Sequence, residues 1–184
     1  PSMSALDTLA QTFADEVNTI HQQGVDANGN AGGELFSIDP AAAHAAGSIS
    51  VALSNPANVA TAESLRVSVA NTNLSNAFGS ISYTAQPATA NYQVRFDTDT
   101  TYSIFDSAGN PVSNNNAYDA SAGINHDGVT ITFSEAPRAG DEFTVAPNTD
   151  AAGDNSNLQA LINLRDAPIM NGSESFADNY LNIV

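Results

Sequence analysis

A narrow apolar stripe near the N-terminus constrains the fold most. Its members recur every three or four positions, which is the spacing of one helical face: Leu6, Leu9, Phe13, Val17 and Ile20. With Ser4 or Asp7 as a cap and Gly24 as a stop signal, the pattern predicts a helix over about residues 4–23. A stripe this narrow is typical of a helical bundle, so the helix needs a partner helix to cover it.

The next hundred residues have the composition of strands and turns. From about Ala46 to Ala146, short runs rich in β-branched and aromatic residues alternate with Asn, Asp, Gly and Pro. The predicted strands are Ser48–Leu53, Ser64–Ala70, Ser80–Thr84, Tyr92–Asp97, Thr101–Asp106, Val129–Phe133 and Glu142–Val145. The fourth and fifth should form a hairpin, because only three residues separate them.

Helical spacing returns after Pro147. Asp154, Asn155 or Ser156 can cap one helix, and Ser173 or Ser175 can begin a last helix that runs to Val184. The sequence thus predicts an α+β fold. Its N- and C-terminal helices should pack as a rod or bundle and carry an inserted, mainly antiparallel β-domain. We expect the helical domain to comprise residues 1–38 and 148–184, and the β-domain residues 39–147.

The charge of the chain excludes several classes of function. Four arginines, no lysine and 20 acidic residues give 184 residues a net charge of −16. Nucleic acid and anionic membrane surfaces are therefore poor partners, since both require a basic patch. The absence of cysteine removes thiol catalysis, disulfides and thiolate metal sites.

Both ends of the sequence give expectations about the parent protein. The start, PSMSALDTLA, lacks the basic and apolar regions of a signal peptide, so export would need a removed signal or another route. The end stops while an apolar helical pattern is still running, and we expect the chain to be a fragment of a longer one.

One loop partly matches a calcium site. Asp26, Asn28 and Asn30 occupy positions 1, 3 and 5 of an EF-hand loop, but Ala31 replaces the required Gly and Ser37 the required Glu. Glu34 falls at position 9 of the pattern. We interpret the stretch as a turn-rich junction and predict no metal there.

The sequence patterns that could indicate catalytic residues are weak. His21, His44 and His126 have no second histidine at zinc-site spacing, although a partly protonated His21 would suit the C-terminus of its helix. Asp127 beside His126 is typical of a turn. The acid pairs Asp97/Asp99 and Asp141/Glu142 could serve a glycosidase only if they flanked a cleft. We therefore predict no catalytic, cofactor-binding or metal-binding residues and no cofactor.

The junction also carries the strongest family signature. FADEVNTIHQQGVDANGNAGGELFSI, residues 13–38, resembles the bacterial flagellar hook-associated protein 1 family, in which a helix ending in N-x-x-H-x-x-G runs into a G-x-D-x-x-G-N-x-G-G-x-x-F junction. The matching residues are Asn18, His21, Gly24, Asp26, Gly29, Asn30, Gly32, Gly33 and Phe36. Residues 92–112 and 124–148 resemble the β-domain of that family, and residues 153–184 its return into the C-terminal helices.

The resemblance implies a structural subunit at the junction of hook and filament, without catalysis. Its implied partners are copies of itself, the hook protein, neighbouring hook-associated proteins and an export chaperone that binds a C-terminal segment. It also implies an extracellular location, reached by type III export without a cleaved signal peptide. The terminal helical segments of the family are missing here, and the Thr72–Gln86 region is too short for the further domain that some members insert.

Two other classes remain open at this stage. One is a calcium-stabilised, adhesin-like β-module. The other is an extracellular hydrolase, which would need two acids and a histidine in one pocket.

Overall fold

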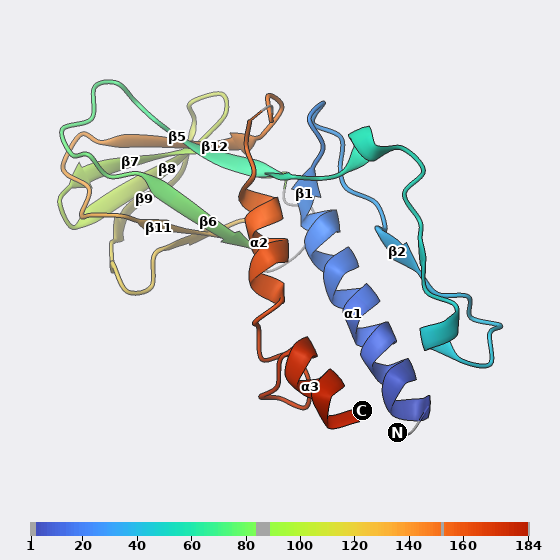
Figure 1. The fold of residues 1–184 in the computed structure, drawn as a ribbon. Coiled ribbons are helices and arrows are strands. Elements are labelled where there is room, and N and C mark those ends of the chain that lie inside the picture. The colour runs from blue at the N-terminus through green and yellow to red at the C-terminus, as the bar shows by residue number, and fades with distance from the viewer. Residues whose placement is uncertain (1–2, 84–88, 152, 184) are drawn as a thin grey trace. The chain divides into compact units, whose positions relative to one another are not determined.

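The computed structural model describes residues 3–83, 89–151 and 153–183, and it divides into two compact units. Unit 1 comprises residues 1–63 and 149–184, and unit 2 comprises residues 64–148. The predicted α+β class is confirmed, since one unit is mainly helical and the other holds the two large sheets (Figure 1). The predicted strand end at Thr84, the Thr84–Gln86 part of the short connection and Val184 lie outside the described residues.

Three helices make the frame of unit 1. Helix α1 spans Met3–Gln23, as the stripe predicted, α2 spans Ser156–Leu164 and α3 spans Phe176–Ile183. Both C-terminal helices contact α1, so they supply the partner that its stripe requires (Figure 1). Ser175 caps α3, because its Oγ accepts the Asp178 N–H at 3.2 Å.

Short strands and turns complete unit 1. Strand β1 (Gly24–Val25) pairs with β4 (Ala62–Glu63), and β2 (Phe36–Ser37) pairs with β3 (Ser50–Val51). The 3₁₀ turns η1 (Ala45–Gly47) and η2 (Pro56–Asn58) lie between them in the sequence. The strand predicted over Ser48–Leu53 is therefore only two residues long and belongs to this unit.

The boundary of the β-rich unit lies later than the predicted residue 39. Residues 39–63 fold within unit 1 because side chains of α1 bind their backbone: Asp7 accepts the Ala46 N–H at 3.0 Å and His21 accepts the Ala60 N–H at 2.9 Å. Their strand-like composition was misleading, since the backbone of this segment bonds mostly to helix side chains and to turns.

Unit 2 contains two antiparallel sheets. The first has the strand order β5-β12-β7-β8-β9 and the second the order β10-β11-β6. The strands are β5 (Leu65–Val69), β6 (Gly79–Tyr83), β7 (Tyr92–Thr98), β8 (Thr101–Asp106), β9 (Pro111–Ala117), β10 (Ile124–His126), β11 (Val129–Phe133) and β12 (Glu142–Pro147).

Alternating side chains build the core of unit 2. Tyr92, Val94 and Phe96 on β7 are all buried, while Arg95 between them is exposed. The predicted hairpin is confirmed, since Val94 lies opposite Ile104 and Phe96 opposite Tyr102. The ring centroids of Phe133 and Phe143 approach to 4.5 Å in the same core.

Candidate assembly surface

Asn18 on α1 binds the return segment that follows the junction. Its Oδ1 accepts the N–H groups of Leu35 at 2.8 Å and Phe36 at 2.9 Å, and its Nδ2 donates to Phe36 O at 2.8 Å. One amide thus binds both the N–H and the C=O of Phe36, as a residue of a neighbouring strand would. The Asn of the N-x-x-H pattern is explained by this role.

His21 lies one helical turn further and is completely buried. Its Nε2 accepts the Ala60 N–H at 2.9 Å, so its Nδ1, 2.7 Å from Gly33 O, carries the proton and donates. Both ring nitrogens of His21 are therefore used by backbone groups of two other segments. The histidine is a structural link between three segments of unit 1.

A second side chain binds the backbone of Ala60. Asn157, near the start of α2, is buried and donates from Nδ2 to Ala60 O at 2.7 Å. The backbone N–H of Ala60 is therefore bound by His21 from α1, and its backbone C=O is bound by Asn157 from α2. We name these three residues, Asn18, His21 and Asn157, the polar clamp.

Two glycines of the signature are needed for the clamp to close. A Cβ on Gly32 would collide with the His21 carbonyl oxygen, and one on Gly24 would collide with the Asn157 side chain and Ala62 O. Any larger residue would push the segments apart. The family signature around residues 18–36 is thus the sequence of a close-packed helix-to-strand junction.

The calcium-like stretch forms a hydrogen-bonded turn. Asp26 Oδ1 accepts the N–H groups of Asn28 at 2.8 Å and Asn30 at 2.9 Å, while Oδ2 accepts Asn30 Nδ2 at 3.0 Å. The side-chain and backbone hydrogen bonds from Asn30 lower the pKa of Asp26 below its usual value. The carboxylate is therefore occupied by protein amides.

The same turn recurs in unit 2, where no calcium pattern exists. Asp106 and Asn110 repeat the D-x-x-G-N spacing, and Asp106 accepts the Asn110 N–H at 2.8 Å and its Nδ2 at 3.0 Å. The glycines also match, with φ of +79° at Gly29 and +83° at Gly109. The same geometry in a second loop thus supports the interpretation of residues 26–30 as a turn.

The remaining candidates for chemistry have separate, structural partners. His44 Nδ1 lies 3.0 Å from Asp7 Oδ2, which fixes η1 on α1, and His126 faces Asp127 at 3.6 Å. In unit 2, Asp97 accepts Ser103 Oγ at 2.5 Å and Asp99 accepts the Ala139 N–H at 2.9 Å. Among the described residues, no group of three or more His, Asp or Glu side chains could hold a metal ion.

Asp141 anchors a loop that the sequence did not indicate. This buried carboxylate accepts the N–H groups of Leu74 at 2.6 Å and Arg138 at 2.9 Å, and also the Ser75 hydroxyl. Glu142 contributes through its backbone, which pairs with the Asn73 side chain. The pair is therefore structural, and its acids do not share one cleft.

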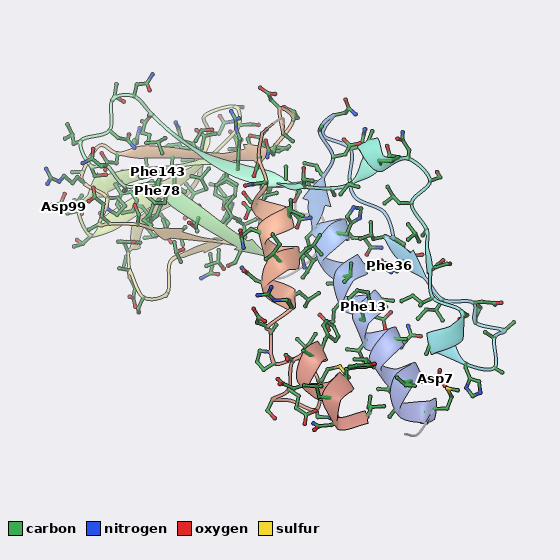
Figure 2. The ribbon with its side chains drawn as sticks, in the orientation of Figure 1. Asp7, Phe13, Phe36, Phe78, Asp99 and Phe143 are labelled. Carbon is green, nitrogen blue, oxygen red and sulfur yellow. The ribbon has the colours of Figure 1, made fainter. Side chains whose placement is uncertain are left out.

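An open apolar groove of about 720 Å³ lies in unit 1. Phe13 lies in its wall, with ring centroids 5.3 Å from Phe36 and 5.4 Å from Phe176, and the first of these pairs is labelled in Figure 2. The other lining residues are Leu6, Leu9, Ala10, Val17, Leu35, Ala46, Leu161, Leu164, Arg165, Ala177 and Tyr180. Only Val17 and Leu164 of this set are buried, so α2 and α3 cover the stripe of α1 incompletely.

The groove is almost without charge. Arg165 is its only charged lining residue, and Arg165 pairs with Asp166 at 2.8 Å. Its walls come from all three helices and from the segment that Asn18 and Asp7 fasten to α1. We take this groove as the candidate assembly surface. No helix within the described residues has the length and apolar character needed to cross a membrane.

Known proteins are similar to this chain in sequence. A family model described as the flagellar hook-associated protein FlgK helical domain matches residues 1–36, which include the Asn18 and His21 arms of the clamp. Flagellar hook-associated protein 1 of Escherichia coli (strain K12) is 28% identical over 206 residues, covering 98% of this chain and 33% of that protein. The chain thus spans about a third of the length of this curated relative.

Solved structures of flagellar junction proteins are also similar. The flagellar hook junction protein FlgK from Burkholderia pseudomallei shares 27% identity, with 81% of this chain and 23% of that chain covered and a TM-score of 0.43. FlgL from Xanthomonas campestris shares 16% identity, with 98% and 77% covered and a TM-score of 0.40.

The sequence matches and the clamp residues agree on one assignment. The family model ends at Phe36, where the segment bound by Asn18 begins, and the curated relative aligns with nearly the whole chain. This chain is similar to flagellar hook-associated proteins over nearly its whole length.

Proposed function

We propose that this chain is part of a structural subunit of the bacterial flagellum, a hook-associated protein 1 that joins hook to filament and performs no catalysis. The observation that carries the proposal is the match of residues 1–36 to the FlgK helical domain, a segment that contains Asn18 and His21 of the polar clamp. The clamp fastens an extended segment to α1 so that helices and segment together present one apolar surface.

The chemistry of the side chains supports a mechanical role. His21, Asp26 and Asp141 are buried and hydrogen-bonded to backbone groups, which fixes loops but leaves these side chains no free position for a substrate. The groove of unit 1 is lined almost entirely by apolar side chains, as surfaces for protein packing are. Its proposed partners are other chains of the flagellar axis: further copies of this protein, the hook protein and neighbouring hook-associated proteins.

The proposal includes the place where the protein acts. We infer an extracellular position at the hook–filament junction, reached by type III export without a cleaved signal peptide and with an export chaperone that binds a C-terminal segment. The relatives and the absence of lysine-dependent or cysteine-dependent chemistry support this placement. The domain arrangement proposed with it is a helical domain interrupted by the β-rich unit.

A complementation experiment tests the proposed function. The full-length parent gene is deleted in its own bacterium and restored as wild type, as Leu9→Glu or as Gln11→Glu. Leu9 lines the groove, whereas Gln11 lies on the exposed face of the same helix. We expect wild type and Gln11→Glu to restore filaments and swimming, and Leu9→Glu to leave hooks without filaments.

The possible outcomes test the proposed function and the use of the groove as an assembly surface separately. Normal filaments in the deletion strain would overturn the proposed function itself. Normal assembly of a stable Leu9→Glu protein would show that the groove is not an assembly surface. Immunolabelling of the restored protein at the hook tip by electron microscopy gives the location directly.

A further inference from the structure

Two Asn–Gly pairs occur in the sequence, Asn28–Gly29 and Asn171–Gly172. In such a pair the glycine nitrogen can attack the asparagine side-chain carbonyl, because glycine has no Cβ to hinder the approach. The reaction is faster where the glycine N–H is not held in a hydrogen bond. The structure places the two pairs in different environments.

Asn171–Gly172 lies in an exposed turn before α3. Asn171 and Gly172 have φ of +51° and +80°, and the Ser173 N–H closes the turn on Met170 O at 3.1 Å. No atom would lie within 4 Å of a Cβ built on Gly172. Within the described residues, the Gly172 N–H donates to no protein acceptor.

Asn28–Gly29 lies in the turn organised by Asp26. The Gly29 N–H donates to Asp26 O at 2.9 Å, and the Asn28 N–H donates to Asp26 Oδ1 at 2.8 Å. Asp26 is only 2% exposed and also holds Asn30. The nitrogen that would attack is therefore occupied, and the turn must open before it can react.

We propose that Asn171 is a site of spontaneous deamidation and that Asn28 is protected from it by the Asp26 turn. In the reaction the Gly172 nitrogen forms a bond to Asn171 Cγ and loses its proton, and the bond from Cγ to Nδ2 breaks, so that ammonia leaves. Water then adds to the cyclic imide and opens it to aspartate or isoaspartate. No redox change occurs, and water is the only co-reactant.

The modification has a structural consequence at the start of α3. Asn171 Nδ2 donates to Glu174 Oε2 at 3.0 Å, and Glu174 also accepts the side-chain amides of Asn179 and Asn182 at 3.0 Å each. Deamidation replaces the Asn171 donor with a carboxylate that repels Glu174. The turn should loosen, and α3, which bears the groove residues Phe176 and Tyr180, should exchange its amide hydrogens faster.

Peptide mapping tests the proposal on the purified 184-residue chain. The protein is incubated at mildly alkaline pH, native or unfolded in guanidinium, and digested with trypsin, which separates residues 1–66 from 166–184 because cleavage follows arginine. In the native protein we expect the 166–184 peptide to gain about one mass unit roughly tenfold faster than the 1–66 peptide, since opening the Asp26 turn costs more than one net hydrogen bond. Unfolding should make the two rates similar.

Two variants make the comparison specific. Asp26→Ala removes the carboxylate that holds the first turn and should accelerate the reaction at Asn28 without changing Asn171. Asn171→Asp should reproduce the faster hydrogen exchange of α3 before any incubation. Equal native rates, or a faster reaction at Asn28, would overturn the proposal. An Asn171 that stays intact in the native protein while it reacts in the unfolded one would do the same.

Discussion

Single polar side chains determine where the extended segments of this protein lie. Asn18 binds the backbone of Leu35 and Phe36 in place of a neighbouring strand. His21 accepts the Ala60 N–H, and Asn157 donates to the Ala60 carbonyl. In unit 2, Asp141 has the corresponding role for the loop at Leu74. Such bonds stabilise strongly because their loss leaves buried backbone groups unpaired.

Replacement of Asn18 tests the clamp. Asn18→Ala removes three hydrogen bonds and should lower the free energy of unfolding by about 3 kcal/mol, at roughly 1 kcal/mol for each bond. Urea denaturation followed by circular dichroism measures the change. The control Gln11→Ala loses only an exposed bond to Asp15 and should change stability by less than about 0.5 kcal/mol. Equal effects of the two variants would contradict the clamp.

Acid titration tests Asp141. Burial opposes the ionisation of its carboxyl, but the hydrogen bonds from Ser75 Oγ and from the Arg138 and Leu74 N–H groups outweigh burial and lower its pKa. Because the folded pKa lies below the unfolded value of about 3.9, Asp141 stabilises the protein at neutral pH, and this contribution is lost as pH falls through the folded pKa.

Asp141→Asn should therefore destabilise unit 2 by about 2–3 kcal/mol at pH 7 and have a smaller effect in acid. Urea unfolding at several pH values measures both changes. Asp99→Asn is the matched control, because Asp99 is exposed and accepts a single backbone N–H. A constant difference between wild type and Asp141→Asn down to about pH 2 would disprove the role of the charged form.

At the scale of elements, α1 is the central piece of unit 1. It contacts α2, α3, η1 and β2, and its apolar face remains partly open along the groove. The stripe predicted the helix and its need for partners, and the partners cover it only in part. Two short helices of nine and eight residues cannot cover a helix of 21 residues along its whole length.

Truncation of Phe13 measures how firmly α1 is docked. Because Phe13 is only half-buried between Phe36 and Phe176, we expect Phe13→Ala to cost about 2 kcal/mol in chemical denaturation. Leu181→Ala on the exposed face of α3 should cost less than about 0.5 kcal/mol, since that side chain is 70% exposed. A cost below 1 kcal/mol for Phe13 would show that the helices do not pack as described.

At the scale of the whole molecule, no bound ion is needed to explain the loops. Both D-x-x-G-N turns satisfy their aspartates with protein amides, so calcium would have to displace existing hydrogen bonds. A ligand that binds only the folded state must raise the melting temperature, and extracellular calcium modules bind at about 0.1–1 mM.

We therefore expect the same melting temperature in a few millimolar calcium and in chelator. Differential scanning fluorimetry measures it, with magnesium as the control for ionic strength. A rise with calcium alone that disappears in Asp26→Asn would favour the adhesin-like alternative instead.

The sequence by itself determined the elements whose pattern is local. The stripe of α1, the alternation of β7 and β8 and the D-x-x-G-N turn are set by the spacing of apolar and turn residues, and the structure has them at or within about a residue of the predicted bounds. The junction signature also sufficed to indicate the family, because its close contacts restrict which residues fit at Gly24 and Gly32.

Tertiary structure decided what depends on partners distant in the sequence. Strand β9 was not predicted, because its asparagines have little strand preference and its pairing with β8 alone makes it a strand. Residues 39–63 looked like part of the sheet but belong to unit 1, since Asp7 and His21 bind their backbone across 39 positions of sequence. Hydrogen bonds of this range leave no periodic pattern, so only the folded chain shows them.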